Sequence, residues 1–109
     1  MKGKIVLVPF PFTDLTAAKL RPALVIYEAE RDVIISFISS KIPSKPSEVE
    51  VLLTKGRRGF EKTGLKADYV VKLDKVATVL KELIVGELGT LDDEVRQEIN
   101  QKLRKIMRI

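Results

Sequence analysis

The chain has 109 residues, a length that predicts one domain with a single hydrophobic core. It contains neither cysteine nor histidine, which excludes disulfides, thiolate metal sites and catalysis by an imidazole. Its net charge of +5 favours an anionic partner such as a nucleic acid.

The first predicted strand covers residues 4–10, which are rich in β-branched side chains and apolar on both faces. Pro9 and Pro11 end its hydrogen-bonding ladder. Together with Thr13 and Asp14, they interrupt the apolar run too early for a signal peptide or a membrane span. We therefore expect a soluble cytoplasmic protein.

Further short segments have the composition of strands and are separated by charged turns or by turns that contain proline or glycine. They cover residues 22–28, 33–40, 48–54, 68–73, 76–79 and 84–88, with one helical turn at 81–83. The connections are short enough for an antiparallel meander. Six or seven short strands followed by one helix predict a mainly β fold, namely a small, partly open antiparallel β-barrel.

The apolar period then changes from two residues to 3.6, which predicts a C-terminal helix over about residues 91–107. The stripe consists of Leu91, Val95, Ile99, Leu103 and Ile106. We expect it to pack over the open end of the barrel, which occupies about residues 3–89 of the same domain. Thr90 is the expected N-cap, with Asp93 in a weaker form of the capping box.

Arg21 is the first candidate for chemistry, because Pro22 biases it toward an extended backbone at the start of a strand. Residues 22–28 and 33–40 form a predicted hairpin, which places Ser39 and Ser40 on the same rim as Arg21. Only one of the two serines can face the arginine, since side chains alternate along a strand. In the alternative interpretation, the arginine closes a hairpin and the serines end a strand.

A guanidinium beside a hydroxyl suits a phosphodiester, because arginine neutralises charge on the phosphorus oxygens and the hydroxyl donates a hydrogen bond. RNA brings its own nucleophile, the 2′-hydroxyl, so no covalent enzyme intermediate is required. The carboxylates are scattered, and none has the spacing of a metal site.

A basic stretch over residues 55–62 either follows a phosphate backbone or is a solvated loop. Phe60 within it either stacks on a base or anchors the loop to the barrel. Asp74 and Lys75, which precede a predicted strand, are either acid–base groups or a surface pair.

Residues 3–27 resemble the opening of the MazF/PemK toxin endoribonucleases, through Phe-Pro-Phe-Thr-Asp and the later Arg-Pro-Ala-Leu-Val-Ile. Ile38-Ser39-Ser40, Gly59-Phe60 and Leu91-Asp92-Asp93-Glu94 are similar to later family elements. The resemblance implies an SH3-like barrel, a homodimer, and cleavage of single-stranded RNA or mRNA without a metal or other cofactor. It also implies inhibition of translation and growth, and an antitoxin partner whose acidic segment occupies the RNA groove.

The central residues of that family, an arginine before proline and a hydroxyl after the third strand, correspond to Arg21 and Ser39, with Ser40 as the other register. By this resemblance, Arg21 stabilises the developing phosphorane and Ser39 holds a phosphate oxygen. Residues expected to contact RNA are Thr13, Asp14, Lys19, Lys41, Lys55, Arg57, Arg58, Phe60 and Lys75.

The chain departs from the family at Ala77, where some members carry a second arginine, and Lys75 or the basic stretch is the candidate replacement. Two other hypotheses remain open. One is a non-catalytic SH3-like module that binds RNA or protein, and the other is a structural domain in which the basic charge has no specific role.

Overall fold

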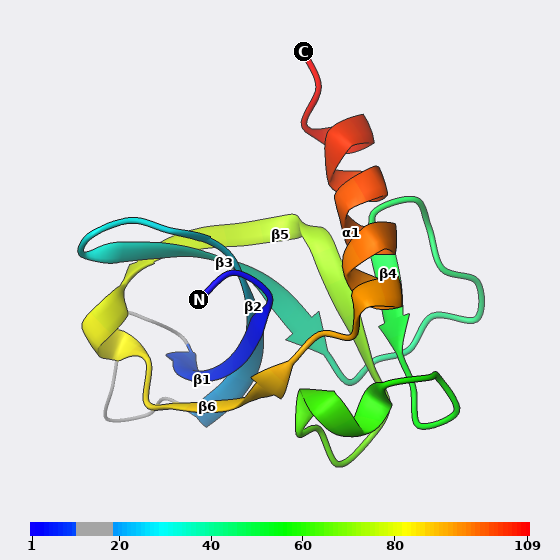
Figure 1. Cartoon of the computed structure of the whole chain (residues 1–109), viewed down its shortest axis with the longest axis horizontal. Coiled ribbons are helices and arrows are strands. Elements are labelled where there is room, and N and C mark those ends of the chain that lie inside the picture. Colours follow the sequence, from blue (N-terminus) through cyan, green and yellow to red (C-terminus); the bar gives the residue numbers. More distant parts are fainter. Residues whose placement is uncertain (11–18) are drawn as a thin grey trace.

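The computed structural model describes residues 1–10 and 19–109 of the chain. Within them, six strands curl into a half-barrel that is followed by one α-helix (Figure 1). The strands are β1 (Lys4–Phe10), β2 (Lys19–Glu28), β3 (Asp32–Ser39), β4 (Glu50–Leu53), β5 (Tyr69–Leu80) and β6 (Gly86–Thr90). Short 3₁₀ helices cover Phe60–Thr63 and Lys81–Leu83, and the helix α1 covers Asp93–Ile106.

The strand order is β4-β5-β3-β2-β1-β6, and every neighbouring pair is antiparallel. The first three strands form the expected meander, but β3 then pairs with β5, and β6 returns to pair with β1. The prediction of a meander is therefore wrong for the second half of the chain. The reason is that β4 forms a pair with β5 at the outer edge, instead of lying between β3 and β5.

Strand β5 is continuous, whereas the sequence predicts two strands with Asp74 and Lys75 between them. Its register against β3 jumps from Lys72 opposite Phe37 to Val76 opposite Ser36, so residues 73–75 form a bulge. The buried Ser36 hydroxyl donates a hydrogen bond of 2.6 Å to the Lys72 carbonyl beside this bulge. Figure 1 shows the resulting bend in β5.

The sheet has a hydrophobic core on each of its two faces. The core inside the curl contains Val6, Val8, Ala23, Val25, Val33, Ile35 and Val79. The core between the sheet and α1 contains Ile5, Leu24, Ile38, Val51, Leu53, Leu65, Val71, Leu73, Leu91, Val95 and Ile99. Neighbours such as Ile5 and Val6 belong to different cores because side chains alternate along a strand.

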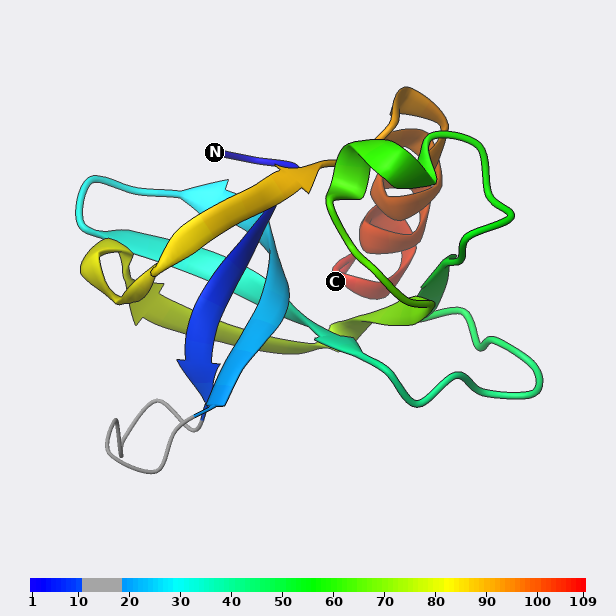
Figure 2. The same cartoon turned by 90° about the horizontal axis from the view of Figure 1, so that it is seen from below.

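The apolar stripe of α1 packs on the sheet as the sequence predicts, with Val95 and Ile99 buried. Figures 1 and 2 show α1 beside β4, at the end of the molecule away from residues 81–83. The N-cap is Asp92, whose carboxylate accepts a hydrogen bond from the Glu94 N–H at 3.3 Å. The prediction of Thr90 is wrong, because that residue ends β6 opposite Lys4. Among the described residues, no helix has both the length and the apolar character needed to cross a bilayer.

Candidate functional site

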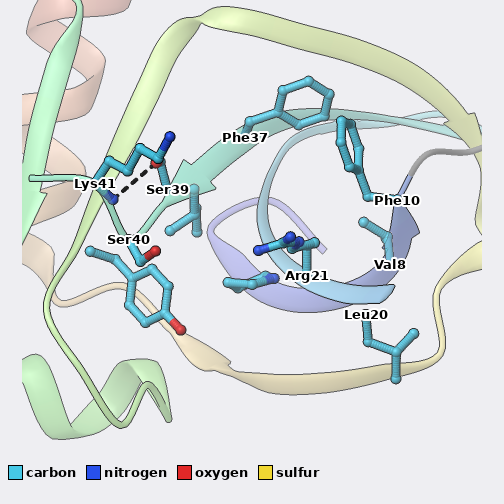
Figure 3. A pocket seen from close by; sticks show the side chains of 11 residues that line it. Val8, Phe10, Leu20, Arg21, Phe37, Ser39, Ser40 and Lys41 are labelled. Carbon is cyan, nitrogen blue, oxygen red and sulfur yellow. Dashed lines mark hydrogen bonds between the residues drawn. The ribbon is translucent and has the colours of Figure 1, made fainter. Parts of the chain in front are cut away.

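A pocket of about 350 Å³ opens where β1 and β3 end and where β2 and β5 begin (Figure 3). It has an apolar lining with a few polar and cationic groups, and no acidic residue contributes to it within the described part of the chain. The lining residues are Val8, Phe10, Leu20, Arg21, Pro22, Phe37, Ile38, Ser39, Ser40, Lys41 and Tyr69.

Arg21 reaches this pocket from the start of β2. It lies opposite Val8 of β1, and the pairing of Ala23 with Phe37 places it opposite Ser39 when that register is extended by two residues. The Arg21 side chain is exposed, and within residues 1–10 and 19–109 it has no hydrogen bond or ion pair. Its guanidinium is therefore available to an anionic ligand, because no carboxylate in that part of the chain neutralises it.

The two serines occupy different positions at the end of β3. Ser39 ends the strand opposite Val70 of β5, and its Oγ accepts a hydrogen bond of 3.1 Å from the Lys41 N–H. Ser40 follows the strand and is exposed. The register puts Ser39 on the face of the sheet that carries Arg21, and Ser40, just beyond the strand end, also lines the pocket. Figure 3 shows Arg21 projecting into the hollow between these serines and the two phenylalanines.

An aromatic pair forms the other flank of the pocket. The rings of Phe10 and Phe37 meet edge to face, with centroids 5.5 Å apart and an interplanar angle of 77°. The sequence analysis did not identify either residue. A signal was present, since Phe37 precedes Ser39 by two residues and Phe10 follows Val8 by two, which places both rings on the pocket face. Their contact joins distant parts of the chain, so no local pattern predicts it.

The other residues expected near the site fall into three groups. Lys41 lines the pocket, whereas the exposed Lys19 lies opposite Phe10 without lining it. Thr13 and Asp14 lie outside the described residues. Lys75 is exposed in the bulge of β5 and does not contribute to the pocket lining.

The basic stretch lies outside the pocket, and part of its charge is used within the fold. Arg57 donates hydrogen bonds to the Leu52 carbonyl at 2.9 Å and to the Glu98 carboxylate of α1. Phe60 packs against the core beneath α1, which is the anchoring alternative. Lys55 and Arg58 are exposed to solvent. A contact between this stretch and RNA stays a prediction.

Two further features concern the chemistry of the site. Ala77, at the place of the second arginine of some family members, lies opposite Ile35 and packs against the core inside the curl. Within the described ranges, no three carboxylates gather in a way that could hold a metal ion. The arrangement thus offers one guanidinium, the hydroxyls of Ser39, Ser40 and Tyr69, an ammonium group and an aromatic wall.

The comparisons with known proteins agree with this architecture. The family model described as "PemK-like, MazF-like toxin of type II toxin-antitoxin system" matches residues 1–107. No curated protein matches the chain.

Several solved structures share the fold. The Mycobacterium tuberculosis toxin MazF-mt6 superposes with a TM-score of 0.74 at 15% identity, covering 97% of each chain. An endoribonuclease in complex with its cognate antitoxin, from a mycobacterial species, gives a TM-score of 0.72 at 14% identity and covers 98% of this chain and 93% of its own. MazF from Deinococcus radiodurans gives 0.69 at 20% identity, with 99% and 96% covered.

Proposed function

The chain belongs to the family of PemK-like, MazF-like toxins of type II toxin–antitoxin systems, and from this premise we propose that it cleaves single-stranded RNA as a metal-independent endoribonuclease. The observation that carries the proposal is the position of Arg21. Its guanidinium has no partner in the described part of the chain and shares an open pocket with Ser39.

In the proposed reaction, the 2′-hydroxyl of one nucleotide attacks the adjacent phosphorus. A cyclic 2′,3′-phosphate forms, and the bond to the 5′ oxygen of the next nucleotide breaks. The 2′-hydroxyl gives up its proton and the leaving oxygen gains one, so the step is balanced. Arg21 binds two non-bridging oxygens through parallel hydrogen bonds, and Ser39 donates a further hydrogen bond to one of them.

The hydrogen bond from the Lys41 N–H orients the Ser39 oxygen and leaves the hydroxyl proton available for donation. With no histidine in the chain, the site acts mainly by stabilising charge on the pentavalent phosphorus. The Arg21 guanidinium is the nearest candidate for assisting proton transfer at the attacking or leaving oxygen.

The proposed protein partner is an antitoxin with an acidic segment. Arg21 and Lys41 are the charged groups in the described pocket lining, so a row of carboxylates would be complementary to it. A structural neighbour, solved as an endoribonuclease with its cognate antitoxin, supports such pairing. Because mRNA is the proposed substrate, we place the protein in the cytoplasm. We also propose a homodimer, in which the RNA-binding surface would extend beyond the pocket of one protomer.

Incubation of the purified protein with a long single-stranded RNA in EDTA tests the activity. We expect fragments with the wild type and with Arg31→Ala, which removes an exposed arginine of the β2–β3 turn. Arg21→Ala should leave the RNA intact. If the wild type binds RNA in a salt-dependent manner without cutting it, the chain is a binding module. The absence of a second arginine at Ala77 would then explain the missing cleavage.

A test in cells addresses the toxin function. Strong expression of the chain should arrest growth. Co-expression of the antitoxin candidate, a small acidic protein encoded next to this chain, should restore growth. Unimpaired growth on strong expression of the wild-type chain would count against the proposed function.

A further inference from the structure

We propose that a second pocket, between α1 and the sheet, binds an acidic side chain together with a large apolar side chain from one extended segment of the antitoxin. The inference rests on the proposed function and extends it, because it gives the antitoxin a contact away from Arg21. The second pocket has a volume of about 260 Å³ and is lined by residues of α1, β2 and the N-terminal segment. Among the described residues, none lines both pockets.

Arg96 of α1 is a partly buried cation in this second pocket. Asp92, one helical turn earlier, has the spacing of an ion-pair partner, but its carboxylate binds Lys62 at 3.0 Å instead. Within residues 1–10 and 19–109, no carboxylate forms an ion pair with Arg96. A guanidinium that is partly withdrawn from water without a counterion favours the binding of an anion.

The backbone around Gly3 holds this guanidinium in place. Arg96 Nη2 donates a hydrogen bond of 3.2 Å to the Thr90 hydroxyl and a long one of 3.5 Å to the Lys2 carbonyl. A Cβ atom at Gly3 would collide with the guanidinium, so the glycine provides the space that it occupies. Because both hydrogen bonds come from Nη2, the donors on Nη1 and Nε stay available to a carboxylate.

The rim of the second pocket adds further groups that suit a negative ligand. Lys2 is exposed there, and its Nζ lies 5.6 Å from the centroid of the Tyr27 ring without an ion pair in the described part of the chain. Asn100 of α1 contributes an exposed carboxamide. No acidic residue belongs to the lining that the structure describes. The charge of this pocket is therefore complementary to a carboxylate.

The floor of the second pocket is apolar and selects what accompanies the carboxylate. It is formed by the buried Leu24 and Ile99 and by the partly buried Ile26 and Leu103. An inorganic anion would leave this surface in contact with water, whereas a large apolar side chain would cover it. Side chains two residues apart in an extended segment point the same way. The fitting pattern is thus an acidic and an apolar residue separated by one residue.

The test uses the peptide acetyl-Glu-Ser-Leu-Ser-Glu-amide, which presents this pattern in both directions. The ¹⁵N-labelled full chain is titrated with it, and saturable shifts are expected at the amides of Gly3, Leu24 and Ile99. A peptide with glutamine in place of both glutamates should bind about 10-fold or more weakly, because the charged hydrogen bonds are lost. A peptide with alanine in place of leucine should also bind about 10-fold more weakly.

Variants of the chain assign the binding to the second pocket. Arg96→Gln should weaken binding of the parent peptide by about 10- to 100-fold and leave the affinity for the glutamine peptide nearly unchanged. Arg104→Gln is the matched control, since it removes an exposed arginine of the same helix outside the pocket lining. Lys2→Gln, which removes an exposed rim charge, should weaken binding by a few-fold only. Thermal unfolding of each variant establishes that it is folded.

The antitoxin candidate links the pocket to its partner. Arg96→Gln should cut RNA as the wild type does, but the antitoxin candidate should bind it more weakly than it binds Arg104→Gln. Equal affinities of the candidate for these two variants would overturn the antitoxin as the source of the segment.

Equal binding of the three peptides, or shifts confined to the pocket of Arg21, would overturn the second site while leaving the nuclease intact. A wild-type dimer that Arg96→Gln converts to a monomer in sedimentation equilibrium would also overturn it, because a second copy of the chain would then cover the pocket. A wild type that binds the parent peptide at the second pocket but cuts no RNA would overturn the nuclease alone.

Discussion

Ser39 accepts a hydrogen bond from the backbone N–H of Lys41 at 3.1 Å, and this contact fixes the hydroxyl at the end of β3. The two residues lie in one short turn, and both line the pocket that holds Arg21. A serine held in this way can donate its proton to a ligand without first searching among rotamers. Its neighbour Ser40, beyond the strand end, has no such side-chain hydrogen bond within the described residues.

This difference predicts that the two serines contribute unequally to cleavage. Ser39→Ala should lower kcat by about 10²-fold, the cost of removing one hydrogen bond to the charge that develops in the transition state. Ser40→Ala should change kcat less, because Ser40 lies beyond the end of β3 and lacks the hydrogen bond that orients the Ser39 hydroxyl. Steady-state cleavage of a fluorogenic oligonucleotide compares them, and an equal loss in both variants would contradict this assignment.

Arg21→Lys separates charge from geometry. The variant keeps one positive charge but loses the planar fork that binds two phosphate oxygens, so we expect most of the cleavage activity to disappear. Binding of a non-cleavable oligonucleotide should fall much less, since the electrostatic attraction remains. Arg31→Lys is the control outside the pocket. Full cleavage activity in Arg21→Lys would show that a point charge suffices.

Arg57 is expected to serve stability more than binding. It ties the basic stretch to α1 through Glu98 and to β4 through the Leu52 carbonyl. Arg57→Ala should lower the free energy of unfolding by about 1–2 kcal/mol, since a partly buried charged hydrogen bond is lost. Arg58→Ala, at the exposed next position, should change it by less than about 0.5 kcal/mol. Urea unfolding measures both, and the reverse order would refute the structural role.

The contact between Lys62 and Asp92, at 3.0 Å, predicts a stability that depends on pH. The hydrogen bond from Lys62, followed by the Glu94 N–H, lowers the pKa of Asp92 below its ordinary 3.8. Because the folded pKa is the lower one, the stabilisation is complete above about 3.8 and is lost as the pH falls through the depressed value. The Asp92 contact also raises the pKa of Lys62 above 10.5, so alkali removes the stabilisation as the pH rises past the raised value.

Asp92→Asn should therefore unfold at a lower temperature than the wild type at pH 7, and the difference should shrink at pH 2. Asp93→Asn, at the exposed first residue of α1, is the matched control. Calorimetric scans at the two pH values provide the measurement. A difference that stays constant with pH would mean that the charge of Asp92 contributes nothing.

Local patterns predict a large part of this fold. The bounds of β1 agree with the predicted residues 4–10, and the apolar period locates α1 within two residues at its start. The hairpin between β2 and β3 follows from two β-rich segments joined by a charged turn. This hairpin also brings Arg21 and Ser39 together, which explains why a local argument reaches the candidate site.

The features that escape prediction depend on contacts between distant residues. Strand β5 runs on through residues 73–75 as a bulge, beside which the Lys72 carbonyl accepts a hydrogen bond from Ser36 of β3. Thr90 is not the N-cap of α1 because it pairs with Lys4 of β1 as the last residue of β6. The ring contact of Phe10 with Phe37 likewise requires the curl of the sheet. The spacing of residues along the sequence does not predict such contacts.

The bent strand β5 has a consequence for how the molecule comes apart. Its first half places Val71 and Leu73 beneath the helix, and its second half places Val79 inside the curl. One continuous strand thus contributes side chains to both hydrophobic cores, so neither core can unfold without disturbing the other. Amide protons on the two sides of the bulge should consequently exchange with solvent in a single shared opening event, and the helix should detach only when the barrel does.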